Sequence, residues 1–383
     1  MKKIKYTFGI LILLTLIIYI SPIGYLIPGL AKIYGTGHTT AFLEDYELFE
    51  NATVKASNEP IDWEKHKNYN QIPLSEEIKE AHQTYKSVAY LIIHKDSLLH
   101  ESYYDGYSSK SKSNSFSMSK SFVSAMLGKA IDQGYITNIN QKVSDFYPQY
   151  NASYGADLTV GDLSSMSSGL DWKEEYYLPI NITTESYFTD DLEELILSRE
   201  IISQPGKEFI YLSGNTQLLG MVVKKAVGKP LSEYFSESFW QPMNAMEDAL
   251  WQVDGKKNEL EKAYCCFATN AKDFARMGKL YKDYGKWNGE QLLDSTFIAM
   301  STKPRFDESP EYGYGWWLTE YKGEKGFAMR GHLGQYVIVF PTSDLIIVRL
   351  GHLKGPSINA HDTSTFHLYI KEGFEMIQNV SKS

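Results

Sequence analysis

Two short segments of this chain each place a serine three residues before a lysine. Ser117 and Lys120 stand in the segment Ser-Phe-Ser-Met-Ser-Lys-Ser-Phe, whereas Ser109 and Lys112 stand in a run of serines and lysines just upstream. On a helix, this spacing puts both side chains on one face, one turn apart. An uncharged lysine amine can then remove the serine proton and make the hydroxyl a nucleophile. Each pair is therefore a candidate for acyl transfer, provided that its segment is helical.

The residues that follow each pair indicate which of them lies on a helix. After Ser117, apolar residues recur at helical spacing at Phe122, Met126 and Ala130, and Gly134 is placed to end the helix. A serine at a helix N-terminus faces free N–H groups and the positive end of the helix dipole, which favour a nucleophile. Capping of the helix by the Ser117 hydroxyl is the structural alternative. The upstream pair has no apolar period behind it and is predicted to be a solvated loop.

Two later motifs add groups that acyl transfer needs. A Pro-Gly turn leads into Tyr211-Leu212-Ser213, where a tyrosine can pass a proton to a leaving group. A buried tyrosine with a satisfied hydroxyl is the alternative. Further on, Gly-His-Leu-Gly-Gln at 331–335 opens a predicted strand, and its glycines let the backbone approach a ligand closely. An ordinary tight turn is the alternative there.

In this order, the Ser-x-x-Lys, Tyr-x-Ser and His-x-Gly motifs resemble those of the penicillin-recognising serine hydrolase superfamily. The sequence is most similar to the class C β-lactamase-like branch, which includes esterases and 6-aminohexanoate-oligomer hydrolases. Met-Ser-Ser-Gly-Leu-Asp-Trp at 166–172 and Tyr-Gly-Tyr-Gly-Trp-Trp at 312–317 also resemble segments of the 6-aminohexanoate-oligomer group. The resemblance covers residues 85–380 and implies a β-lactamase/transpeptidase-like fold.

The resemblance also implies a role for each motif residue. Ser117 would be the acylated nucleophile, Lys120 its base, and Tyr211 the group that assists proton transfer with the leaving group. Substrate and oxyanion binding would fall to Ser213, which stands where an asparagine is common, and to His332, Gly334, Gln335 and Tyr176. In particular, the oxyanion would lie between the backbone N–H groups of Ser117 and Gln335, and Tyr176 would close over the substrate from the loop at 171–177.

One departure from the superfamily pattern bears on the substrate. The Lys-Thr-Gly motif that holds a β-lactam carboxylate is replaced by His332-Leu333-Gly334. Leucine cannot hydrogen-bond a carboxylate, and histidine is only partly charged near neutral pH. The expected substrate is therefore a small ester or linear amide. A penicillin-binding or cell-wall-peptide sensor, a D-alanyl carboxypeptidase-like protein with slow or no turnover, and a non-catalytic scaffold are the alternatives.

Strands are predicted near both ends of the chain, with helices between them. Residues 87–104 are predicted to form two strands around a turn at 95–97, and a strand meander is predicted between 326 and 351. Helices are predicted at 190–199, 214–227, 270–284 and 361–380. This pattern predicts an α+β fold, in which an antiparallel sheet from both chain ends is flanked by helices and a helical region is inserted. The catalytic domain is placed at 86–383, with 32–85 as an extension leading into it.

The first 31 residues have the composition of a membrane segment. Lys2, Lys3 and Lys5 precede a stretch from Tyr6 to Ala31 that carries no charge. That stretch is long enough to cross a bilayer as a helix, and the basic flank is expected to stay in the cytoplasm. An uncleaved membrane anchor with an extracytoplasmic catalytic domain is therefore predicted. A cleaved signal peptide, which would give a secreted protein, is the alternative.

Composition narrows the partners and the chemistry. The 383 residues carry a net charge of −9, which argues against a nucleic-acid partner. No phosphate-binding loop or zinc motif is present, so neither a cofactor nor a metal is expected. The two cysteines, Cys265 and Cys266, are adjacent and are predicted to be buried free thiols, because a bridge between neighbours would strain the peptide. The sequence leaves the oligomeric state open.

Overall fold

A seven-stranded sheet forms the centre of the protein. The computed structural model describes residues 7–8, 15–19, 21, 23–176, 178–359 and 361–380. The strand order is β10-β11-β12-β13-β3-β4-β2, so strands from both chain ends lie in one sheet. Its strands are β2 (Glu64–Lys65), β3 (Ser87–His94), β4 (Ser97–Tyr103), β10 (Trp317–Tyr321), β11 (Glu324–Gly331), β12 (Gln335–Phe340) and β13 (Leu345–Gly351). The predicted α+β fold with a sheet from both chain ends is confirmed.

The two chain ends meet where β13 pairs with β3. The pairing is antiparallel and sets Ile347 opposite Ile92. All neighbouring strands of this sheet are antiparallel except β2, which runs parallel to β4. The turn between β3 and β4 consists of Lys95 and Asp96, both with positive φ, which is the backbone of the tight hairpin turns that match strand twist. The predicted turn is thus confirmed.

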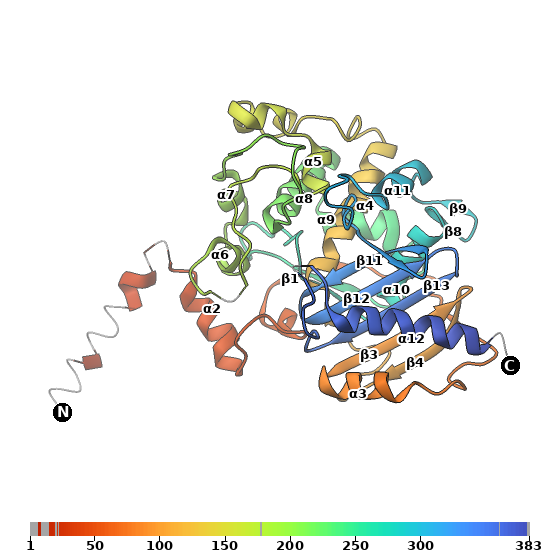
Figure 1. Ribbon diagram of the computed structural model, residues 1–383. Helices are drawn as coiled ribbons and strands as arrows, with labels where there is room; N and C mark the ends of the chain where they lie inside the picture. Colours follow the sequence, from red (N-terminus) through yellow and green to blue (C-terminus); the bar gives the residue numbers. More distant parts are fainter. Residues whose placement is uncertain are drawn as a thin grey trace.

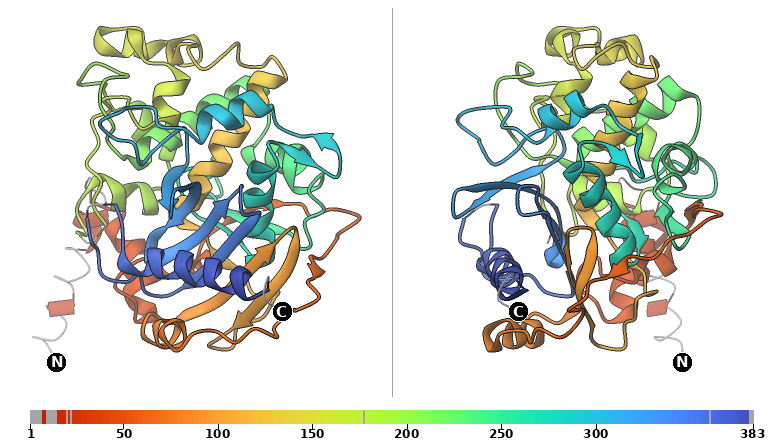
Figure 2. Two further views of the ribbon diagram at one scale, coloured as in Figure 1. Left: turned by 45° about the vertical axis from the view of Figure 1, so that its right-hand side comes forward. Right: turned by 90° about the vertical axis from the view of Figure 1, so that its right-hand side faces the viewer.

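Helices cover both faces of this sheet. The C-terminal helix α12 (Ser364–Val380) and α3 (Glu76–Thr84) lie on one face, and α10 (Ala271–Lys282) lies on the other (Figures 1 and 2). Alternate residues of β3 point to opposite faces, so Tyr90 and Ile92 join the core under α12, whereas Leu91 and Ile93 join the larger core with α10. Burial on both faces explains why β3 reads as a continuous apolar run.

A helical region stands beside the sheet and contains the long helices α4 and α8 (Figure 1). The helix α8 ends at Gly228, whose φ is positive. The region and its neighbours comprise α4 (Ser119–Asp132), α5 (Val160–Ser164), α6 (Ile182–Phe188), α7 (Leu192–Leu197), α8 (Ser213–Val227), α9 (Leu231–Phe235), the π-helical turn η7 (Ser236–Trp240), α11 (Ser295–Ser301), and the short turns η3 (Phe116–Met118), η4 (Val143–Asp145), η5 (Pro148–Tyr150) and η6 (Ser153–Asp157). The predicted helices at 190–199, 214–227, 270–284 and 361–380 correspond to α7, α8, α10 and α12.

Residues 32–85 contribute a strand to each of the two larger sheets, in addition to leading into the domain. The strand β1 (Asn51–Val54) is the edge of a second, four-stranded sheet with the order β1-β6-β7-β5. The strand β2 is an edge of the large sheet. The remaining short elements are η2 (Asp45–Leu48), β5 (Ser113–Asn114), β6 (Ala249–Gln252), β7 (Phe267–Thr269), β8 (Lys286–Trp287), β9 (Glu290–Gln291) and η8 (His332–Gly334).

Residues 1–6, 9–14, 20 and 22 of the predicted membrane segment, residues 1–31, lie outside the described residues. Within the described part of the chain, no helix has the length and apolar character needed to cross a membrane. The described end of this segment forms α2 (Leu26–Ile33), followed by η1 (Tyr34–Thr36). The helix α2 lies beside α6, where Gly29 faces the ring of Phe188 (Figure 1).

Candidate active site

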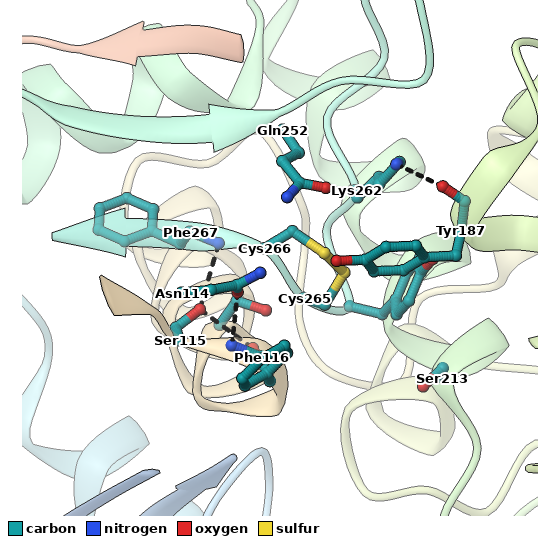
Figure 3. The surroundings of a disulfide bond; sticks show 12 residues. Asn114, Ser115, Phe116, Tyr187, Ser213, Gln252, Lys262, Cys265, Cys266 and Phe267 are labelled. Carbon is teal, nitrogen blue, oxygen red and sulfur yellow. Dashed lines mark hydrogen bonds between the residues drawn. A yellow bond between two sulfur atoms is a disulfide. The ribbon is translucent and has the colours of Figure 1, made fainter. Parts of the chain in front are cut away.

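Ser117 lies on a strained turn directly before α4. Phe116, the residue before it, has a φ of +45°, which is uncommon for a side chain of this size. The Asn114 side chain holds this turn, because its Oδ1 accepts a hydrogen bond of 2.8 Å from the Phe116 N–H (Figure 3). Ser117 remains partly exposed while its neighbours Phe116 and Met118 are buried. The turn thus presents the Ser117 hydroxyl to solvent at the N-terminal end of α4.

Lys120 lies one turn further on, with its amine buried against Ser117. Its Nζ donates to Ser117 Oγ at 3.0 Å, to the Tyr264 carbonyl at 2.8 Å and to Ser213 Oγ at 3.3 Å. Burial lowers the pKa of Lys120 to about 8, while the charge of Glu174 acts in the opposite direction. A substantial fraction of this lysine is therefore neutral near physiological pH. Capping of the helix, the structural alternative for Ser117, is not what its hydroxyl does here, because no side chain caps α4.

Tyr211 closes the same cluster from the segment before α8. Its ring centroid is 5.1 Å from Lys120 Nζ, and the Ser117 side chain lies close enough to oppose the rise in the pKa of the phenol. The ring packs against Trp317, with the ring centroids 5.1 Å apart. Burial raises the pKa of Tyr211, so the phenol keeps its proton at neutral pH. The structure therefore brings the three predicted catalytic residues, Ser117, Lys120 and Tyr211, into one cluster.

Glu174 is a site residue that the sequence did not single out. Its carboxylate accepts four hydrogen bonds, from the Ser213 N–H at 2.7 Å, Ser213 Oγ at 2.6 Å, Tyr176 Oη at 2.6 Å and Trp172 Nε1 at 2.9 Å. It is therefore the negative charge that faces the Lys120 amine through Ser213. The loop at 171–177 contains three acidic residues, and spacing alone could not indicate which of them points inward.

Tyr176 and His332 line the site beside the catalytic cluster. Their rings stack, with centroids 5.5 Å apart, and the His332 ring also meets the edge of Phe116. Burial is the main cause that lowers the pKa of His332 to about 4, with a smaller contribution from the charge of Lys354. His332 is thus neutral at physiological pH. Its environment is unlike that of a lysine that binds a carboxylate.

Of the three residues predicted to bind substrate at the corner between β11 and β12, only one side chain lies in the site. Gly331 approaches the nucleophile turn so closely that a Cβ on it would lie 2.2 Å from the Ser115 carbonyl oxygen. Gly334 instead faces Arg349, and the Gln335 amide is buried in bonds to the carbonyls of His332 and Gly351. Arg349 donates to the Leu333 and Gly334 carbonyls and so fixes the corner from behind. His332 reaches the site, whereas the Gln335 side chain and Gly334 do not.

A comparison with models of known protein families identifies the family of this chain. The model of the Beta-lactamase family matches residues 74–367. The chain belongs to the Beta-lactamase family. The match begins at residue 74, before the predicted start of the catalytic domain at residue 86. It therefore includes α3, which packs against the sheet in this Beta-lactamase family protein.

Individual relatives indicate the branch. The chain is 26% identical to the 6-aminohexanoate-dimer hydrolase of Paenarthrobacter ureafaciens over 73% of this chain and 74% of that protein. A Bacillus anthracis structure provisionally assigned as a 6-aminohexanoate-dimer hydrolase superposes with a TM-score of 0.74 at 18% identity, covering 95% and 96% of the two chains. A family VIII carboxylesterase superposes with a TM-score of 0.60 at 16% identity, covering 80% and 99%. The predicted resemblance is confirmed.

A pocket of about 890 Å³, including the part open to solvent, begins at Ser117 in this Beta-lactamase family protein. Ser213, Tyr176 and His332 line it beside the nucleophile, and neither Gly334 nor Gln335 is among its described lining residues. Its other walls come from α2, α6 and the segments that follow α2 and precede α6. The site lies in a large concave pocket, as small-molecule sites usually do.

The prediction of free thiols in this family member was wrong. Cys265 and Cys266 are joined by a disulfide and are both buried. The backbone accommodates the bridge because Cys266 adopts a positive φ of 73°. Figure 3 shows the disulfide between Tyr187 and the segment that leads to Ser117. Cys265 lines the pocket, and the Tyr264 carbonyl next to it accepts from Lys120. The bridge therefore fixes backbone that positions the base.

The second serine–lysine pair of this protein lies elsewhere. Ser109 and Lys112 stand in turns and coil before β5, where Ser108 and Ser111 hydrogen-bond to each other. Neither residue of this pair lines the pocket among the residues that the structure describes. The prediction of a loop is confirmed. The pair offers a matched control for experiments on Ser117 and Lys120.

Substitution of Gly331 tests the close approach of the β11–β12 corner to the nucleophile turn. Gly331→Ala is expected to lower kcat/KM for an ester by at least about tenfold, because the new methyl group must displace the backbone at Ser115. Gly35→Ala is the control, since a Cβ at Gly35 meets no atom within 4 Å. Ester turnover and the midpoint of thermal unfolding would be measured for both variants. Equal turnover of the two would contradict the expectation.

Proposed function

We propose that this protein is a serine hydrolase that cleaves small esters or linear amides through an acyl-enzyme on Ser117. The observation that carries the proposal is the 3.0 Å contact between Lys120 Nζ and Ser117 Oγ, on an amine whose pKa is lowered to about 8. An amine that is partly neutral and within hydrogen-bond reach meets both requirements for a general base. The hydrolase relatives support the same reaction class.

The first half of the reaction forms the acyl-enzyme. Neutral Lys120 takes the Ser117 proton while Oγ attacks the substrate carbonyl carbon, and the carbonyl oxygen becomes an oxyanion. Backbone N–H groups at Ser117 and at the Gly331–His332 corner are the proposed donors to that oxyanion. They replace the Gln335 N–H expected from the resemblance, because Gly331 packs on the nucleophile turn and His332 lines the pocket. Tyr211 gives its proton to the leaving group as the bond to carbon breaks, and the Lys120 ammonium then reprotonates Tyr211.

The second half of the reaction repeats these proton transfers with water. Lys120, again neutral, takes a proton from the water that attacks the acyl carbon, and Ser117 leaves with a proton returned by Tyr211 or Lys120. Glu174 stabilises the ammonium form of Lys120 that each half generates, because its charge lies beside the amine. The carboxylate also fixes the Ser213 hydroxyl through a 2.6 Å bond, which orients a second contact to Lys120.

The third motif favours a linear ester or amide over a β-lactam. His332 is neutral at physiological pH, and Leu333 has no hydrogen-bonding side chain. No lysine or arginine is among the described residues that line the pocket. A β-lactam carboxylate would therefore lose its hydration without gaining a charged partner.

The test is Ser117-dependent ester turnover by the full-length protein. Wild type is expected to release p-nitrophenol from p-nitrophenyl acetate with a burst followed by steady turnover, and intact mass should show a transient acetyl adduct. Ser117→Ala should lose both, whereas Ser109→Ala, the matched control, should retain both. An adduct without steady turnover would support the sensor alternative. No adduct and no turnover in wild type would support the scaffold.

The pH dependence of this turnover follows from Lys120. The base works only when neutral, so kcat/KM is expected to rise with pH and to level off above about 8. Because the Glu174 charge raises the Lys120 pKa, Glu174→Gln should move this limb to lower pH. The same variant should lower the plateau by about tenfold, since bonds to a charged acceptor are worth about 1.5–3 kcal/mol. A pH–rate profile checks both effects, and an unshifted limb would contradict the role of Glu174.

We also propose that residues 1–31 anchor the protein with its catalytic domain outside the cytoplasm. The uncharged stretch behind Lys2, Lys3 and Lys5 supports an anchor. The Cys265–Cys266 disulfide supports an oxidising compartment, where such bonds persist. Protease treatment of intact cells, followed by detection of the membrane-bound protein, tests this orientation. Digestion only after lysis, or recovery in the soluble fraction, would contradict it.

A further inference from the structure

The pocket at Ser117 extends away from the leaving-group side of the catalytic cluster. Ser117, Ser213 and His332 line its inner end, whereas neither Tyr211, the proposed proton donor to the leaving group, nor Lys120 is among the described lining residues. A substrate held with its leaving group toward Tyr211 must therefore direct its acyl chain into this pocket. The pocket is accordingly the acyl side of the site.

The far end of the pocket is apolar. Two helices that are distant in sequence form it, α2 with Leu26, Gly29 and Ile33, and α6 with Phe188. Leu178 and Ala41 add further apolar surface between them. Gly29 lets α2 pack directly against α6 there, since a Cβ on it would lie 2.8 Å from the Phe188 ring. Without a bound ligand, the open part of this apolar surface is in contact with water. An apolar ligand would remove that unfavourable contact.

The charges of the pocket lining disfavour a substrate whose acyl chain ends in a charged group. Glu175 is the single charged side chain among the described lining residues, and it pairs with Lys173 at 3.4 Å. His332 is neutral, as its lowered pKa of about 4 indicates. A carboxylate at the end of the acyl chain would find no cation in the described lining, and an ammonium would compete with Lys173 for one carboxylate. Desolvation would thus oppose either charged end.

We infer that the substrate carries a medium-length or long unbranched apolar acyl chain, which lies between α2 and α6 while its carbonyl carbon faces Ser117. This inference rests on the proposed hydrolase function and names the substrate class for the same site. The residues before 74, which include α2, lie outside the matched region of the family model. The chain-binding wall is therefore built in part by α2, most of which is the end of the segment 1–31.

A chain-length series tests the inference on the full-length protein. The p-nitrophenyl esters of acetate, butyrate and octanoate would be compared below their micelle-forming concentrations, together with the 8-aminooctanoate ester. Each buried methylene is expected to raise kcat/KM by about threefold. Octanoate should thus exceed butyrate by at least about tenfold, and the ammonium-bearing ester should fall well below octanoate.

A pair of variants locates the chain. Leu26→Lys places a cation in the far wall and should lower the octanoate-to-acetate ratio of kcat/KM by about tenfold or more. Ile202→Lys makes the same change at an exposed apolar residue that does not line the pocket, and should keep the wild-type ratio. Thermal unfolding of both variants shows whether either has lost its fold.

The outcomes separate this inference from the proposed function. Ser117-dependent turnover with equal kcat/KM on acetate and octanoate would overturn the inference alone. A preference for the 8-aminooctanoate ester would overturn it in favour of amine recognition at Glu175. An unchanged ratio in folded Leu26→Lys would overturn the placement between α2 and α6. Absence of Ser117-dependent turnover on every ester would overturn the proposed function and this inference together.

Discussion

Replacing Lys120 by methionine is expected to lower kcat/KM for p-nitrophenyl esters by about 10²–10⁴-fold, the usual contribution of a positioned general base. The amine contacts Ser117 Oγ, Ser213 Oγ and the Tyr264 carbonyl, and its side chain is almost fully buried. Methionine fills a similar volume without the base. In this variant, the Ser117 hydroxyl would have to lose its proton to solvent.

The control for this prediction is Lys112→Met in the second serine–lysine pair. That residue lies in the loop before β5 and should tolerate the change with wild-type turnover. The pH profile gives a further readout, because the residual activity of Lys120→Met should lose the limb near pH 8. Turnover within tenfold of wild type, or an unchanged limb, would mean that another group removes the Ser117 proton.

A second large effect is expected at Asp45, which lies far from Ser117 in sequence but holds the turn that carries it. Asp45 is fully buried and accepts hydrogen bonds from Tyr187 Oη, from Asn114 Nδ2 at 2.8 Å and from Gln252 Nε2 at 3.1 Å. Burial raises the pKa of Asp45, and the hydrogen bonds from Tyr187 and Asn114 and the charge of Lys262 act in the opposite direction. Asn114 in turn accepts from the Phe116 N–H. Through Asn114, Asp45 thus connects the strand β6, which carries Gln252, to the turn that carries Ser117.

Asp45→Ala is expected to lower the free energy of unfolding by roughly 3–5 kcal/mol, since it leaves the buried donors of Tyr187, Asn114 and Gln252 without their acceptor, at about 1–3 kcal/mol each. It should also lower kcat/KM, because Asn114 loses the partner that orients it. Asp45→Asn keeps an acceptor in the same place and should be intermediate in both respects. Urea unfolding and ester turnover would be measured on each variant.

The matched control for Asp45 is Asp248, an exposed carboxylate paired with Lys55. Asp248→Ala should cost less than about 1 kcal/mol, as is typical of surface ion pairs. A loss of stability at Asp45 no larger than that at Asp248 would contradict the role given to the buried network. Full stability with reduced turnover would restrict that role to the nucleophile turn.

Local patterns in the sequence were sufficient for the elements with strong periodicity. The strands β3 and β4, their turn, the helices α4 and α8, and the final meander could all be predicted, because each is encoded by neighbouring residues. The short strands β1, β5, β6 and β7 could not. Strands of two to four residues have no readable period, and they exist because they pair with partners far away in the chain.

The candidate site divides in the same way. Ser117, Lys120 and Tyr211 belong to motifs of fixed spacing, so their types and their order along the chain are enough to indicate acyl transfer. Glu174 belongs to no motif that spacing could identify, because its role depends on which carboxylate of a loop turns toward Ser213. The pairing of Cys265 with Cys266 likewise depends on a positive φ that only the folded backbone reveals.

By itself, the sequence determined the candidate nucleophile, its candidate base and the order of the motifs around them, since residues three apart on a helix share one face whatever surrounds them. The tertiary structure alone decided which turn residues reach the site, which carboxylate faces the lysine, and that α2 walls the pocket. These features depend on contacts between segments that are distant in the chain. The same contacts bury Lys120, which lowers its pKa, and form the walls of the pocket.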